Sequence, residues 1–184
     1  MNYFTSVKSA AANLQAVAMC YESAMLSAFV LAPQNVQPHA AALVVRSLAA
    51  LVPLVVQGLV RDVILVGPAT AAWQGIADHG GCGLAETMAN AMVMARQPWV
   101  FVIQAGFAPE AGFADEAEDF IASGAGAALL RAKPTGFFTR LFPDSAALAG
   151  IILRATGHIG TDLAGLAKNA SPCHTLAARA RRVG

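Results

Sequence analysis

The sequence predicts an α/β fold: a compact single domain with three α/β/α layers around a mostly parallel sheet. Short apolar runs that stop at Gly, Pro or a polar turn recur along the chain and indicate buried strands. Longer segments with apolar residues at helical spacing separate these runs. Right-handed crossovers between such strands make the sheet mostly parallel. A chain of 184 residues is also long enough to bury one sizeable core.

The first part of the chain predicts a helical extension followed by the first strand. Residues 1–24 are rich in Ala and Ser, and apolar residues recur there at helical spacing, namely Val7, Ala11, Leu14, Val17 and Ala18. Leu26–Ala32 is a strand, and the following Pro, Gln and Asn residues form the loop that ends it. The sequence therefore predicts an N-terminal helical extension over residues 1–24 and a domain that begins at residue 25.

A long helix and the most strand-like run of the chain follow. His39–Gln57 carries a buried apolar face, with Pro53 expected to kink or shorten the helix and Gly58 to stop it. Val63–Val66 is a run of four apolar residues that ends at a Gly-Pro turn, so we expect a strand buried on both faces. In an open α/β sheet, this carboxyl end of a strand is where ligands bind.

The middle of the chain alternates helices and strands. Ala71–Ala77 predicts a short helix and Cys82–Ala85 a minor strand. Thr87 is a good N-cap for a helix that runs to about Arg96, where Pro98 stops it. Trp99–Ile103 is the third strong strand and ends in another polar turn.

The last third predicts one more helix and one more strand. Pro109 suits the first turn of a helix to about Ser123, whose apolar face leaves its acids pointing outward. Ala127–Arg131 is a strand. Beyond it we expect short helical or irregular pieces around residues 137–142, 145–154 and 176–182.

Composition excludes a disordered chain. Hydrophobic residues make up 57% and charged residues 12% of the sequence, which indicates a large core or an apolar surface covered by a protein partner or by self-association. Ser47–Val60 is too short an uninterrupted apolar run for a membrane span and favours a core helix. Three widely spaced Cys residues without metal-like spacing, and no recognisable signal peptide, predict free thiols and a cytoplasmic location.

Charge is unevenly distributed although the net charge is +1. Five carboxylates lie in residues 110–119, and a solvated helix face explains them better than paired catalytic carboxylates. Residues 161–184 form a basic C-terminal tail, which is either simply solvated or touches an anionic membrane through Arg179, Arg181 and Arg182. We expect no specific nucleic-acid binding.

The order of strands and helices over residues 25–160 resembles the nucleotide-sugar half of family 2 glycosyltransferases, which have the A-type glycosyltransferase fold. The resemblance rests on order, spacing and hydrophobic pattern. The segments that carry it are Phe29–Pro33 with Asn35 behind it, Leu48–Val56, Asp62–Val66, Ile76–Cys82, Trp99–Gly106, Phe113–Ile121 and Gly150–Arg154. It implies a domain similar to nucleotide-diphospho-sugar transferases.

The sequence departs from that family where the family has its ligands. The family's aspartates for the base and ribose correspond to Gly67 and Ala72, with Thr70 the polar residue that remains. Its Asp-X-Asp pair, which holds the divalent ion, corresponds to Gln104 and Gly106. The resemblance thus implies a nucleotide-binding set of Pro33, Asn35, Gly67, Thr70, Gln104 and Gly106, and no metal site.

These departures weaken the family chemistry. A hard cation needs anionic oxygen ligands, so Mn²⁺ or Mg²⁺ is expected only if the chemistry survives. Each base or ribose donor left unpaired costs about 1–3 kcal/mol. Asp162 is the one late acid that could serve as the catalytic base.

Three functions stay open. The first is a degenerate glycosyltransferase-like domain that acts as a binding or assembly component. The second is an active, metal-independent glycosyltransferase that uses Thr70, Gln104 and Asp162 on a nucleotide-sugar donor, with a basic lid from Arg131, Lys133 or Arg140. The third is a scaffold or partner-binding subunit without a small-molecule ligand.

Overall fold

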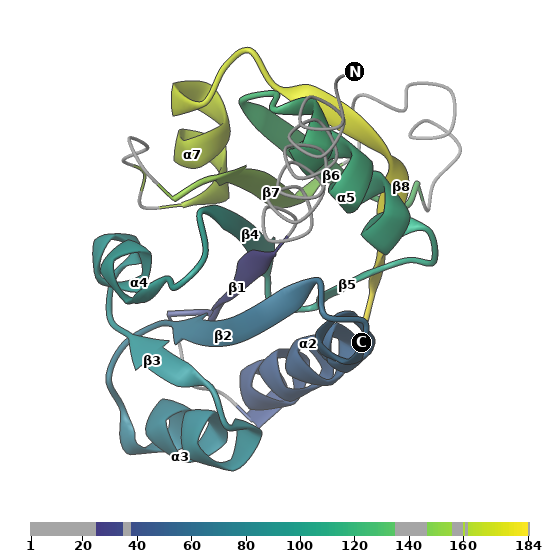
Figure 1. The fold of residues 1–184 in the computed structure, drawn as a ribbon. Helices are drawn as coiled ribbons and strands as arrows, with labels where there is room; N and C mark the ends of the chain where they lie inside the picture. The colour runs from purple at the N-terminus through teal and green to yellow at the C-terminus, as the bar shows by residue number, and fades with distance from the viewer. Residues whose placement is uncertain (1–24, 35–37, 135–146, 156–159, 161, 184) are drawn as a thin grey trace, which may run out of the picture.

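A computed structural model describes residues 25–34, 38–134, 147–155, 160 and 162–183 of the chain (Figure 1). The helix predicted over residues 1–24 and the piece predicted over 137–142 lie outside the described residues, as do Asn35 and Arg140.

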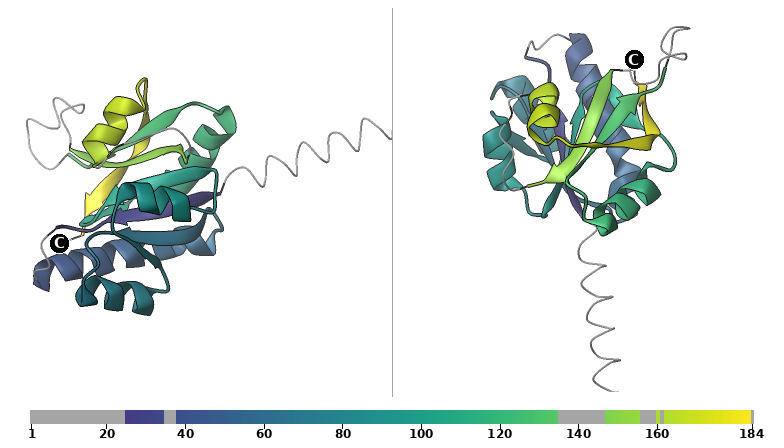
Figure 2. Two further views of the ribbon diagram at one scale, coloured as in Figure 1. Left: turned by 90° about the vertical axis from the view of Figure 1, so that its left-hand side faces the viewer. Right: turned by 90° about the horizontal axis from the view of Figure 1, so that it is seen from above.

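One sheet organises the described part of the chain (Figures 1 and 2). Its spatial order is β3-β2-β1-β4-β7-β6-β8-β5, and four of its seven strand pairs are parallel. The mostly parallel α/β sheet is therefore as predicted. The strands are β1 Leu26–Leu31, β2 Val60–Val66, β3 Gly83–Ala85, β4 Trp99–Gln104, β5 Phe107–Pro109, β6 Ala127–Ala132, β7 Leu148–Arg154 and β8 His174–Arg182.

The first strand lies at the centre of the parallel part. β1 pairs with β2 on one side and with β4 on the other, both in parallel. Its residues Leu26 to Val30 are fully buried, as an apolar strand between two neighbours should be. The predicted strands at 26–32, 99–103 and 127–131 agree with β1, β4 and β6 within one residue, and the predicted strand Val63–Val66 is the carboxyl-terminal part of β2.

Helices pack on both faces of this sheet. One core cluster joins β1 and β4 side chains to the helices α2 Pro38–Val56, α3 Ala71–Gly80 and α5 Phe113–Ser123. A second cluster joins the opposite faces of the same strands to α4 Met88–Met94 and α7 Leu163–Asn169. Successive side chains of a strand point to opposite faces of the sheet. Ala28 and Val30 therefore pack in the first cluster, and Phe29 packs in the second.

The long helix α2 follows the predicted span closely. Pro53 lies inside it without ending it, and Gly58, with φ +85°, stops it in the left-handed region that glycine adopts without strain. The window His39–Val56 is long and apolar enough to cross a membrane by length and composition alone. In the fold, however, Val44, Leu51 and Leu54 of this helix pack in the core cluster.

The expected helix start at Pro109 is wrong. Pro109 ends β5, and α5 begins at Phe113 after Gly112, which adopts φ +87°. The short strand β5 escaped prediction because three residues carry no usable alternation. The buried face of α5 is the predicted one, namely Phe113, Ala117, Phe120 and Ile121.

The helical or irregular pieces expected at 145–154 and 176–182 are wrong, because both ranges contain strands, and the residues predicted as a basic C-terminal tail over 161–184 include α7 and β8. Residues 148–154 form β7, which inserts antiparallel between β4 and β6. Residues 174–182 form β8, which pairs with both β6 and β5. Its alternating basic and small residues hid the strand, because Ala and Arg favour strands weakly and only tertiary pairing selects them here.

An acid on α5 compensates for an irregularity in β8. The pairing of β6 with β8 shifts register between Leu129 and Arg131. Near this shift, the Glu116 carboxylate accepts hydrogen bonds from the backbone N–H groups of Ala177 and Ala178, at 2.5 and 2.6 Å. The predicted acidic face is therefore not wholly solvated, since Glu116 replaces ladder bonds that the shift disrupts.

Substitution of Glu116 tests this contact. We expect Glu116→Ala to lower the free energy of unfolding by about 2 kcal/mol, because two backbone donors lose a charged acceptor. Glu118→Ala, on the exposed side of the same helix, should change it by less than about 0.5 kcal/mol. Urea denaturation of both variants measures the difference, and equal stabilities would contradict the role of Glu116.

A pair of glycines tests the packing of β7 against β4. A Cβ at Gly150 would lie 2.8 Å from the Val102 carbonyl oxygen and 3.0 Å from Phe101 Cε2, whereas one at Gly75 in α3 meets nothing within 4 Å. We expect Gly150→Ala to destabilise the fold by about 1–3 kcal/mol. Gly75→Ala should stabilise it by about 0.5–1 kcal/mol, since Ala favours helix interiors. Thermal unfolding distinguishes the two, and a neutral Gly150→Ala would show that β7 lies further from β4.

Candidate binding cleft

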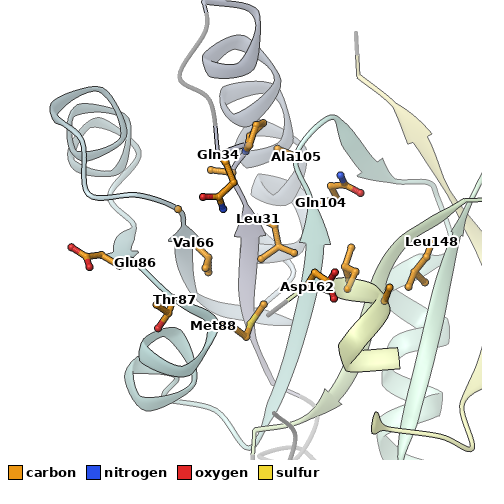
Figure 3. A pocket seen from close by; sticks show the side chains of 15 residues that line it. Leu31, Gln34, Val66, Glu86, Thr87, Met88, Gln104, Ala105, Leu148 and Asp162 are labelled. Carbon is orange, nitrogen blue, oxygen red and sulfur yellow. The ribbon is translucent and has the colours of Figure 1, made fainter. Parts of the chain in front are cut away.

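A cleft of about 620 Å³ opens at the carboxyl ends of the central parallel strands (Figure 3). Leu31, Val66 and Gln104, the last residues of β1, β2 and β4, all line it. From β1 the chain continues to β2 and β3 on one side, and then returns to β4 on the other. This reversal of strand order is the position where open α/β sheets bind ligands.

Three segments complete the walls of the cleft. Glu86 and Thr87 come from the connection between β3 and α4, Met88 is the first residue of α4, and Leu148 is the first residue of β7. Asp162 with the first residues of α7 closes the opposite side. Figure 3 shows Asp162 on the side of Gln104 and Leu148, with Glu86 at the other rim.

The floor of the cleft is tight where β1 and β2 end. The Ala32 N–H donates to the Val66 carbonyl at 2.8 Å, and the Gly67 N–H donates to the Ala85 carbonyl at 2.9 Å. A Cβ at Gly67 would lie 2.8 Å from Ala32 Cβ. A carboxylate at position 67 therefore requires Ala32 to move, so this position carries backbone only.

The structure brings together four of the residues singled out in the sequence. Pro33, Gly67, Gln104 and Asp162 all line the cleft. This proximity gives their places in space and does not assign them a ligand.

Thr70 and Gly106 do not line the cleft and have structural roles. The Thr70 hydroxyl caps α3 by accepting from the Trp73 N–H at 3.4 Å. Gly106 adopts φ +93° in the turn between β4 and β5, and its N–H donates to the buried Ser47 hydroxyl at 2.9 Å. That hydroxyl donates in turn to the Phe107 carbonyl at 2.9 Å, so α2 holds the turn.

Glu86 and Thr87 are cleft residues that the sequence did not point to as a site. Thr87 was correctly expected as a helix cap, and its hydroxyl accepts from the Asn90 N–H at 3.2 Å. Glu86 directly precedes that cap at the end of a parallel strand, and this placement was the available signal. Only the pairing of β3 with β2 brings both residues to the edge of the sheet where β1 and β2 end.

The charges on the cleft wall are negative. Among its lining residues Glu86 and Asp162 are acidic and no described residue is basic. Lys133, one of the expected lid residues, forms an ion pair with Glu110 at 3.0 Å, and neither Lys133 nor Arg131 lines the cleft. Within the described ranges, no group of three or more His, Cys, Asp or Glu side chains could hold a metal ion.

Asp162 already holds one structural contact. Its Oδ1 accepts from the Gly165 N–H at 2.7 Å and caps α7. A Cβ at Gly165 would lie 2.9 Å from that oxygen, so the cap is closely packed. Oδ2 lies on an exposed residue and stays available to a ligand.

The described cysteines are not activated nucleophiles. Burial raises the pKa of the Cys82 thiol, and the charge of Asp78 raises it further, while a backbone hydrogen bond acts in the opposite direction. Burial also raises the pKa of Cys173. A raised pKa keeps both thiols protonated at neutral pH. Nucleophilic attack requires the thiolate form instead.

Comparison with known proteins adds little to this geometry. No family model matches the chain, and no curated protein matches it. One solved structure that is similar is described as "The Crystal Structure of UDP-glucose pyrophosphorylase complexed with UDP-glucose", with 8% identity, 85% of this chain and 92% of that chain covered, and a TM-score of 0.43. A likeness this distant does not bear on the ligand or activity of this chain.

Two substitutions separate the cap from the charge at Asp162. Asp162→Ala removes the side-chain acceptor, and we expect it to lower the free energy of unfolding by about 0.5–2 kcal/mol. Asp162→Asn keeps an acceptor that caps equally well and should stay within about 0.5 kcal/mol of the parent. Urea denaturation of the parent protein and the two variants measures these differences. An Asn variant as unstable as the Ala variant would mean that the charge itself stabilises α7.

Proposed function

We propose that this chain is a nucleotide-sugar-transferase-like domain that has lost metal-dependent sugar-diphosphate chemistry. In this proposal its cleft binds a neutral, hydroxyl-rich ligand, such as a sugar or nucleoside, and the domain acts as a binding or assembly component. The three-layer, single-domain form of the glycosyltransferase fold belongs to the same proposal.

The observation that carries the proposal is the composition of the cleft wall. The polar lining side chains are the amides Gln34 and Gln104, the capping Thr87, and the carboxylates Glu86 and Asp162. Amides and carboxylates bind hydroxyl groups well, since they offer acceptors and N–H donors. The same carboxylates repel a diphosphate unless a cation intervenes.

The position of Gly67 supports the loss of the family's base and ribose contacts. Ala32 occupies the space beside Gly67 that a side chain would need. The second position, Gln104, contributes an exposed amide with no charge to balance a cation.

The metal-independent transferase receives less support. Its Thr70 is used as a helix cap outside the cleft, and its Lys133 is paired with Glu110. Of the described residues that this hypothesis uses, only Gln104 and Asp162 line the cleft.

Partners and location remain proposals from the sequence alone. Arg181 and Arg182 are exposed on β8, so contact with an anionic membrane through Arg179, Arg181 and Arg182 would use side chains of this strand. The cytoplasmic location, a protein partner or self-association, and the lack of specific nucleic-acid binding have the same status.

Titration calorimetry tests the proposed ligand class. We expect uridine, guanosine or a simple sugar to bind at least as tightly as UDP- and GDP-sugars, with no gain from Mn²⁺. Gln104→Ala should weaken that binding about tenfold, the loss of one hydrogen bond of about 1.4 kcal/mol. Gln57→Ala, an exposed glutamine after α2, is the matched control. Micromolar binding of a sugar nucleotide that requires Mn²⁺ would overturn the proposal.

A further inference from the structure

The outer face of α2 carries an exposed apolar stripe. Val45, Val52 and Val56 have exposed fractions of 49%, 55% and 80%. Ala42 and Ala49 are exposed on the same face. These five residues, here called the α2 seam, follow one another at alternating spacings of three and four, as the contact positions of a coiled coil do.

The inner face of the same helix is already used by the core. Val44, Ser47, Leu51 and Leu54 are buried against the sheet. α2 is therefore apolar on both sides, which is typical of a helix covered on both sides. Within the described residues, no element contacts enough of the outer side to bury the α2 seam.

The chain itself supplies a segment that ends beside the seam. The Leu26 N–H donates to the Leu59 carbonyl at 2.8 Å, three residues beyond Val56. Arg61 Nε donates to Met25 Sδ at 3.1 Å and fixes the same place. The segment of residues 1–24 therefore joins the domain next to the carboxyl end of α2.

That segment repeats the spacing of the α2 seam. Its apolar residues Phe4, Val7, Ala11, Leu14 and Ala18 also alternate spacings of three and four. A constant offset of 38 residues pairs them in order with Ala42, Val45, Ala49, Val52 and Val56. With this offset a large residue would lie opposite a small one, as for Phe4 and Ala42. The central pair would be Ala11 and Ala49.

We propose that residues 4–18 dock on the α2 seam as a helix parallel to α2. Parallel direction follows from the attachment, because the segment enters β1 where α2 ends. Both stripes span 15 residues, or about 22 Å of helix. Residues 19–25 reach at most about 23 Å when extended, enough to pass from the sheet to the outer side of α2.

The attachment favours this occupant over a second copy of the chain. Attachment through only seven residues, 19–25, would give the segment an effective concentration in the millimolar range at the seam. A second copy would have to compete with it at micromolar protein. Docking would also cover the valines that otherwise remain exposed to water.

A disulfide pair tests the register. In the 184-residue chain with Cys20, Cys82 and Cys173 replaced by Ser, we expect Ala11→Cys and Ala49→Cys to form a disulfide within one chain on mild oxidation. Facing contact positions bring the Cα atoms within the range that a disulfide requires. Ala10→Cys with Ala49→Cys is the control and should react at least tenfold more slowly. A disulfide between two chains instead would show a second copy on the seam and overturn the proposal.

Limited proteolysis tests docking without new cysteines. Lys8 is the one trypsin site in the first 24 residues. We expect Val52→Glu to speed cleavage after Lys8 at least tenfold, because a charge on the seam releases the segment. Val93→Glu, at a valine 87% exposed on α4, should leave the rate unchanged. Equal cleavage rates in the parent and Val52→Glu would overturn the proposal.

Discussion

The structure depends on the double parallel pairing of β1. This strand shares hydrogen-bond ladders with β2 and β4 over its whole length. Parallel neighbours need crossovers that pass over the faces of the sheet, so the pairing places α2 and α3 on one face and α4 on the other. The same pairing leaves the carboxyl ends of the three strands side by side, and this creates the cleft.

Packing at the floor of the cleft determines which positions can carry a polar side chain. Gly67 is a position without a side chain because Ala32 fills the space next to it. The polar groups of the cleft therefore come from surrounding segments, with Glu86 from one side and Asp162 from the other. Glu86 directly precedes the cap Thr87, and Asp162 is itself the cap of α7, so the elements that hold the fold also orient the acids. A wall with amides and carboxylates but no described base suits hydroxyl groups better than phosphates.

The helix α2 connects the fold to its surroundings. Its inner face holds the β4–β5 turn through the Ser47 hydroxyl, and its outer face carries the α2 seam. An apolar helix that is only half covered accounts for part of the high hydrophobic content of the chain. The docking proposed for residues 4–18 and the ligand proposed for the cleft are independent, since the α2 seam and the cleft share no residue.

The sequence by itself determined the α/β class, the four main strands, α2 and the buried face of α5. Each of these has a strong local signal, such as the β-branched run Val63–Val66 with its Gly-Pro stop, or Thr87 ahead of a helix. Local signals reflect backbone preference and burial, which depend on near neighbours along the chain.

Only the tertiary structure decided the antiparallel insertion of β7, the strand β8 and the membership of the cleft. Residues 174–182 have no strong strand preference and become a strand because β6 and β5 offer them backbone partners. Glu86, Gln104 and Asp162 are far apart in sequence, and their meeting depends on strand order. Contacts between distant segments are set by which faces and edges remain unpaired after local structure forms, and no single stretch of sequence contains that information.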